Sequence, residues 1–192
     1  MSSSPTKHKS EFTSPQSASE ETSTGPNVVL LDLCHRWEKL RLDIWADFAG
    51  CTLGDGIGLW EADALDDDAD DEKLAEIRAK DEREDWRKLS EDDLAAGYVA
   101  LNFTDAAGFR FLLPAFMLNE LNSAGMTLIY LSQTREDYRG KPSILNYHQV
   151  KCVVDFLETF LSDSSESFHH EDITNSLAVF WRPLLVSKTP VS

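Results

Sequence analysis

Hydrophobic positions recur at helical spacing along most of the chain. In the first such run, large apolar side chains follow one another at intervals of three or four residues, and the run ends at Gly50. This interval places side chains on one face of an α-helix. The sequence therefore predicts a first helix that starts after Asn27, a good N-cap residue, and stops before Gly50. Its apolar face would consist of Val29, Leu33, Trp37, Leu40, Ile44 and Phe48.

Two more helices are predicted between about residues 70 and 103. The first runs to Leu89, is rich in Glu, Lys, Arg and Ala, and suits an exposed helix that Trp86 and Leu89 anchor to the core. The second starts at Ser90, an N-cap residue followed by three acidic residues that favour the helix dipole. Its apolar side chains are expected to point inward: Leu94, Tyr98 and Leu101.

The run DAAGFRFLLPAFMLNELN, residues 105–122, is apolar almost all round. A helix of this kind belongs at the centre of a domain. Thr104 is predicted to cap it. Pro114 should kink or split it, because proline lacks the backbone donor and clashes with the preceding turn.

The C-terminal third is predicted to be helical as well. Residues 126–134 contain Thr, Ile and Tyr, which favour a strand, but a lone strand would have no partner, so a short helix is preferred. Asn146 and Gln149 have capping-box spacing and open a further helix. A last helix starts near His170 and is expected to stop at Pro183.

These elements predict an all-α fold, a single compact bundle-like domain of five to six helices with a Pro-kinked central helix, over residues 27–187. Residues 188–192 form a short C-terminal tail. In residues 1–26, twelve positions are Ser or Thr, and the large apolar side chains are Met1 and Phe12. Such a segment buries too little area to offset its ordering entropy, which predicts a disordered tail. Its role would be that of a solvated leader or of a phosphorylation or docking segment.

The composition excludes some classes of partner. The chain carries 34 acidic and 18 basic residues, a net charge of −16. Nucleic acids and anionic membrane surfaces are therefore disfavoured partners, and no apolar run is long enough to span a membrane. Cys34, Cys51 and Cys152 are widely separated and form no CxxC motif, which favours a soluble protein in the reducing cytoplasm.

The acidity is concentrated in one stretch. Residues 61–93 hold 16 acidic and six basic residues, so this segment carries −10 of the total charge of −16. Such a surface would accelerate association with a basic partner protein, although a charge run can also be only a solvated face. The candidate docking surface consists of Asp66, Asp67, Asp68, Asp70 and Asp71. The favoured function is a noncatalytic protein-binding or immunity-type module.

Motifs for metals, phosphate or cofactors are incomplete. Gly54, Gly56 and Gly58 alternate, but neither a preceding strand nor a P-loop lysine accompanies them. The acidic run from Asp66 matches the first positions of a calcium loop but has Asp71 and Ile77 in place of the required Gly and Glu. The pairs His148 with Cys152 and His169 with His170 lack further ligands nearby in sequence. No metal or cofactor is predicted.

The alternative function is a small enzyme or an anion-binding domain. Asp55 and Glu61, with Arg110 in the central helix, would line a pocket at the 54–61 loop. Arg110 stays charged, so it needs an acceptor or a route to water. It would pair with a carboxylate or cap carbonyls at the Pro114 break, or else bind an anion. No residue is assigned a catalytic role, and the enzyme class is the less favoured one.

The run ALNFTDAAGFRFLLPAFML, residues 100–118, resembles the signature of a bacterial family known as domain of unknown function 6714. Members often have proline at the first helical position, where this chain has Asp105. The resemblance covers about residues 37–181 and supports the domain boundaries, and it implies no activity. The flanking residues that agree with it are Gly54, Asp55, Trp86, Leu89, Gln149, Phe156, Leu157, Phe180 and Trp181.

Overall fold

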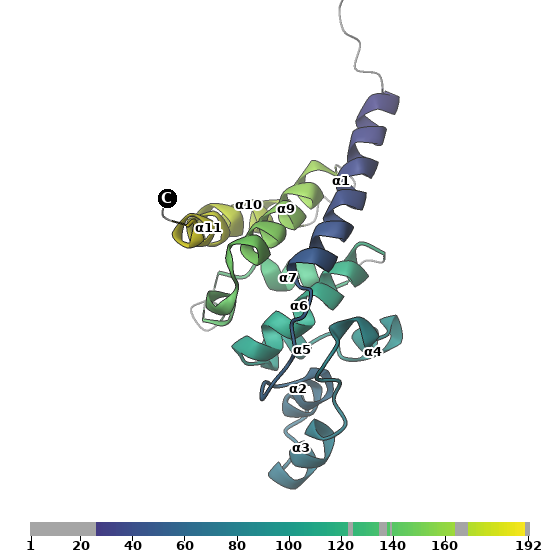
Figure 1. The fold of residues 1–192 in the computed structure, drawn as a ribbon, viewed down its shortest axis with the longest axis vertical. Coiled ribbons are helices and arrows are strands. Elements are labelled where there is room, and N and C mark those ends of the chain that lie inside the picture. Colours follow the sequence, from purple (N-terminus) through teal and green to yellow (C-terminus); the bar gives the residue numbers. More distant parts are fainter. Residues whose placement is uncertain (1–25, 123–124, 135–137, 139, 164–168, 191–192) are drawn as a thin grey trace, which may run out of the picture.

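The computed structural model describes residues 26–122, 125–134, 138, 140–163 and 169–190 (Figure 1). The predicted disordered tail, residues 1–26, lies outside these residues except for Pro26, which begins the first helix. All regular structure of the described ranges is helical, which confirms the predicted all-α class. The longer helices are α1 (Pro26–Asp47), α2 (Leu59–Asp66), α3 (Asp71–Arg78), α6 (Ala106–Glu120) and α9 (Tyr147–Ser162). The shorter ones are α4 (Glu91–Ala96), α5 (Ala100–Phe103), α7 (Thr127–Leu131), α10 (His170–Ser176) and α11 (Arg182–Lys188).

Helix α6 lies at the centre of the domain, as its all-round apolar sequence predicts. Ten of its fifteen residues are buried. It packs against α1, α4, α5 and α7, and also against two short 3-10 helices, η1 (Trp86–Lys88) and η2 (Lys141–Ile144). The helix continues through Pro114, so the predicted split does not occur. Packing on so many sides offsets the one backbone hydrogen bond that proline removes.

Helices α1 and α9 pack side by side and cover one face of this centre (Figure 1). Leu40 and Ile44 of α1 are buried, as is Phe48 directly after the helix, and these are three of the six residues predicted on its apolar face. Trp37 lies edge-on to Phe160 of α9, with ring centroids 4.7 Å apart. The prediction that Asn27 caps α1 is wrong, because the helix already includes that residue.

The helix predicted over residues 126–134 is confirmed as α7, and the capping box of Asn146 and Gln149 is confirmed at the start of α9. Trp181 is fully buried, and its indole Nε1 donates to the carbonyl of Leu131 at 2.8 Å, which ties the C-terminal helices to α7. Pro183 does not stop the last helix. A π-helical turn, Leu177–Trp181, leads into α11, and Pro183 lies in the first turn of α11, where proline costs no hydrogen bond.

The predicted helix over residues 70–89 is shorter than expected. Helix α3 ends at Arg78, and residues 79–85 run back along the loop at residues 51–58 as irregular chain. Asp81 and Arg83 in this stretch bind backbone groups of that loop and of α2, and these contacts take the place of further helical turns. Helix α2 is not predicted by the sequence analysis, which places a loop at residues 54–61; in the structure, the helix begins at Leu59.

Two predictions around α4 and α5 are corrected. Ser90 is the predicted N-cap, and Asp93 completes a capping box with it. Helix α4 stops at Gly97, which packs so closely on Leu59 that a Cβ there would lie 2.8 Å from its Cδ1. The change of direction leaves Tyr98 54% exposed, although its spacing predicted an inward side chain. Asp105, not Thr104, is the N-cap of α6.

Candidate functional site

The glycine-rich loop at residues 51–58 is packed against the start of α6. The Asp105 carboxylate accepts hydrogen bonds from the backbone nitrogens of Ile57, at 3.2 Å, and Gly108, at 2.8 Å. A Cβ on Gly108 would lie 2.1 Å from the Ile57 carbonyl oxygen. A Cβ on Gly56 would lie 2.8 Å from the backbone nitrogen of Gly108. These glycines allow the backbones of loop and helix to approach closely.

Arg78 brings two of the predicted residues together. Its Nη1 donates to both carboxylate oxygens of Glu61, at 2.9 and 3.1 Å, and its Nη2 donates to the backbone carbonyl of Asp55. Glu61 is 8% exposed, so its charge needs this partner. The pair therefore fastens α3 to α2 and to the loop.

Asp81 caps the N-terminus of α2. Its carboxylate accepts from the backbone nitrogens of Trp60, at 2.9 Å, and Glu61, at 3.1 Å. Burial raises the pKa of Asp81, and these two hydrogen bonds oppose the rise. Arg83 donates to the carbonyls of Gly54 and Gly56 from the other side of the loop. Asp81 and Arg83 thus hold the loop at residues 54–61, where the sequence analysis expected a pocket if the protein is an enzyme or binds an anion.

Arg110 is not bonded to the residues of this cluster. It forms no ion pair or hydrogen bond with any other described residue, and its Nε is buried without a partner. None of the described carboxylates pairs with Arg110, and Glu61 pairs with Arg78. The predicted carbonyl cap at Pro114 is wrong, since α6 does not break there. Burial raises the pKa of the Cys51 thiol, and the nearby charge of Arg110 opposes that rise.

The five aspartates of the predicted docking surface lie where α2 ends and α3 begins. All five are exposed, and α3 has no buried residue. Figure 1 shows α3 at one end of the molecule, away from α1 and α9. Asp70 caps α3 by accepting from the backbone nitrogen of Lys73 at 2.9 Å, and Asp68 has a left-handed backbone with φ 54°. Burial first, and then the charges of Asp67 and Asp66, raise the pKa of Asp63.

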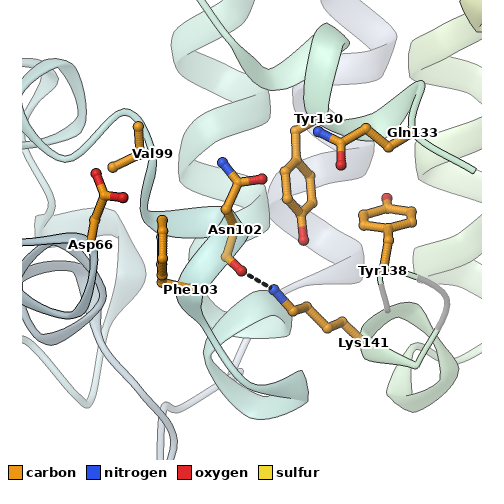
Figure 2. Close-up of a pocket in the computed structure, with 8 residues that line it drawn as sticks. All are labelled: Asp66, Val99, Asn102, Phe103, Tyr130, Gln133, Tyr138 and Lys141. Atoms are coloured by element: carbon orange, nitrogen blue, oxygen red, sulfur yellow. Dashed lines mark hydrogen bonds between the residues drawn. The ribbon is translucent and has the colours of Figure 1, made fainter. Parts of the chain in front are cut away.

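A cavity of about 550 Å³ lies beside these aspartates (Figure 2). Lys141 reaches across it from η2, and its ammonium donates to the carbonyls of Leu101, at 2.9 Å, and Asn102, at 2.7 Å. Asp66 lies at the opposite end of the cavity from Lys141 and Tyr138 (Figure 2). The phenol of Tyr138 is buried, which raises its pKa. The cavity is therefore lined by both aromatic and polar groups.

The cavity continues into a groove between α4 and α5 on one side and α7 on the other. A narrow cavity shares Val99, Asn102 and Tyr130 with it. The same narrow cavity shares Tyr98 and Met126 with a third cavity, of about 430 Å³. We call this continuous depression the α5–α7 groove. At the end farthest from Asp66 it is lined by Glu91 and Asp92.

Sequence reasoning missed the residues that organise this region. Arg78 and Asp81 were assigned to an exposed helix, and the signal available was the dense mixture of charges in a stretch with few apolar positions. Tyr98 was assigned to the core, although Gly97 directly before it is a helix-ending residue. Nothing in the sequence indicates that Phe103 and Met126 would line one groove.

The described ranges contain neither a metal-binding cluster nor a membrane-spanning helix. There, no group of three or more His, Cys, Asp or Glu residues has the arrangement to hold a metal ion. None of the described helices combines the length and the apolar character that crossing a bilayer demands.

Comparison with known proteins gives one result. Residues 37–185, more than half of the chain, match the model of a family described as "Family of unknown function (DUF6714)". The match agrees with the resemblance seen at residues 100–118 and covers α2 to α10 in full. Neither a curated protein nor a solved structure gives a significant match.

Proposed function

Since the chain belongs to the family DUF6714, whose description assigns no function, we propose a function from the structure: a noncatalytic module that binds a basic protein through its acidic surface. The acidic surface is the set of exposed aspartates between α2 and α3. It consists of Asp66, Asp67, Asp68, Asp70 and Asp71.

The observation that carries this proposal is that these charges are exposed and not neutralised. Of the five aspartates, Asp70 forms a hydrogen bond, to a backbone nitrogen, and none forms an ion pair with another described residue. Glu76 in α3 behaves differently: Lys80 and Lys73 bind its carboxylate and lower its pKa to about 2. The chain thus pairs some of its acids and leaves this group facing solvent.

Unpaired charges of one sign repel one another; at Asp63, where burial is the main cause of the raised pKa, the charges of Asp67 and Asp66 raise the pKa further. A cationic partner relieves the repulsion and is attracted from a distance of about a Debye length, roughly 8–10 Å at physiological ionic strength. The expected interaction is therefore fast to form and sensitive to salt.

Affinity capture with two charge-matched variants tests the proposal. The first replaces Asp66, Asp67, Asp68 and Asp71 with Asn, which also tolerates the left-handed backbone at Asp68. The second neutralises four exposed acids outside the acidic surface, Asp32, Glu38, Glu171 and Asp172, with Asn or Gln. Both change the net charge by the same amount.

Each protein is used to capture partners from native lysate at low and at high salt, followed by mass spectrometry. We expect one stoichiometric basic protein that binds the wild type and the second variant at low salt and is lost with the first variant. If the two variants lose it equally, only the total charge matters and the assigned surface is wrong. Recovery of no partner at low salt would overturn the proposal.

A further inference from the structure

The α5–α7 groove exposes large apolar side chains. Tyr98 is 54% exposed, Met126 is 44% exposed and Phe103 is 37% exposed. All three line the joined cavities described above. Apolar side chains gathered in one depression of a domain surface are typical of a binding site for another chain.

Acidic side chains mark both ends of this groove. Asp66, a member of the acidic surface, lines one end, and Glu91 and Asp92 line the other. The cation in the groove, Lys141, is directed at the carbonyls of Leu101 and Asn102. The exposed apolar side chains of the groove are therefore accompanied by acidic ones, Asp66 in the first cavity and Glu91 and Asp92 in the third.

We propose that the α5–α7 groove binds a segment of the basic partner protein that carries large apolar residues in its middle and Lys or Arg at both ends. This inference rests on the proposed function and adds which part of the partner is recognised. The cationic ends of the segment lie against Asp66 and against Glu91 and Asp92. Its apolar side chains lie on Tyr98 and Met126.

The chemistry of the lining explains this choice of occupant. Tyr supplies a large, rigid apolar surface with a polar tip, and Met adapts its shape to irregular partners. Charges at the ends give direction and selectivity, because an acidic or uncharged segment gains no ion pairs and an acidic one is repelled. Exposed Tyr98 and Met126 contribute little to folding, so they can be changed without unfolding the domain.

Selection from a random dodecapeptide display library tests the inference on the full chain. Peptides are selected on the wild type and counter-selected on the double variant Tyr98→Ala with Met126→Ala. We expect enriched peptides with apolar residues between Lys or Arg at each end. By fluorescence anisotropy, each single variant should weaken their binding about tenfold, a loss of about 1.4 kcal/mol. Val179→Ala and Val186→Ala, which truncate exposed apolar residues elsewhere, should leave binding unchanged.

The outcomes separate this inference from the proposed function. If enriched peptides bind the Tyr98 and Met126 variants normally but fail to bind the variant lacking the four aspartates, the groove is not the recognition site and the acidic surface still is. If no peptide is enriched, or the enriched peptides have no cationic ends, the inference is wrong, while lysate capture decides the proposed function independently. If Tyr98→Ala abolishes self-association of the chain, the groove binds a second copy and the inference is also wrong.

Discussion

The central helix and the acidic region of α2 and α3 are held in place by different forces. Helix α6 buries ten of its fifteen residues against six other elements, whereas α3 buries none. Helix α2 buries Leu59 and Ala62, and polar contacts connect it to α3 and to the loop: the Arg78–Glu61 pair, the Asp81 cap and the Arg83 bonds. The residues that stabilise the fold are therefore different from the exposed aspartates of the acidic surface. We expect substitutions in the acidic surface to have little effect on the fold.

Truncation of a buried aromatic in α6 is the strongest test of this contrast. Phe111 is fully buried, and Phe111→Ala should lower the free energy of unfolding by about 3–5 kcal/mol, because it removes apolar contacts and leaves a cavity. Phe103→Ala in the groove removes the same side chain from a partly exposed position, and the expected loss is less than about 1 kcal/mol. Urea denaturation followed by circular dichroism measures both. If both variants lose the same free energy of unfolding, the central helix contributes no more to stability than the exposed groove does.

The contact between the loop and α6 should tolerate no added methyl group. Gly108→Ala places a Cβ against the Ile57 carbonyl, so we expect a loss of about 2–3 kcal/mol. Gly140→Ala is the control, because Gly140 has φ −66° and ψ −38° and an added Cβ would find open space. It should leave stability unchanged or raise it by about 0.4–1 kcal/mol. Thermal and urea unfolding measure the stability of both variants. If Gly108→Ala is as stable as the wild type, the loop can move to make room for the added methyl group.

Removal of one cation tests the polar contacts of the acidic region. Arg78→Gln leaves the buried Glu61 carboxylate without its partner, and because Arg78 is 38% exposed we expect a loss of about 1–2 kcal/mol, below that of a fully buried pair. Lys73→Gln removes an exposed partner of Glu76 and should be indistinguishable from the wild type. Denaturant midpoints of the two variants give the comparison. If they match, the Arg78 pair contributes no more than a surface ion pair.

The smallest effect is expected from the titration of Asp81. Its pKa is raised in the folded state, so the carboxyl keeps its proton to higher pH there than in the unfolded chain. Its contribution to stability is therefore present at low pH and is lost as pH rises through the folded pKa. The stability of the wild type relative to Asp81→Asn should therefore fall as the pH rises above about 4, the ordinary pKa of an Asp carboxyl. Urea titrations over this range measure the difference, and a rise with pH would mean that the backbone hydrogen bonds outweigh burial.

Local sequence patterns predicted the helices whose signals lie within a few residues. Ser90 with Asp93 and Asn146 with Gln149 form their capping boxes, because each satisfies backbone donors of its own first turn. The all-round apolar run of α6 likewise placed that helix at the centre, since a helix without a polar face must be buried. The exposed aspartates of the acidic surface were also predictable from sequence, as charge without an apolar partner stays in water.

Only the tertiary structure decided how distant segments meet. The sequence does not show that Arg78 would bind Glu61, that Asp81 would cap α2, or that Tyr98 would line a groove with Met126. Each of these contacts joins residues that are 17 or more positions apart, and each depends on how the chain turns at a glycine or ends a helix. Helical periodicity shows which face of a helix is apolar. It does not show which distant residues that face contacts, because those contacts, and the groove between them, depend on how the helices pack.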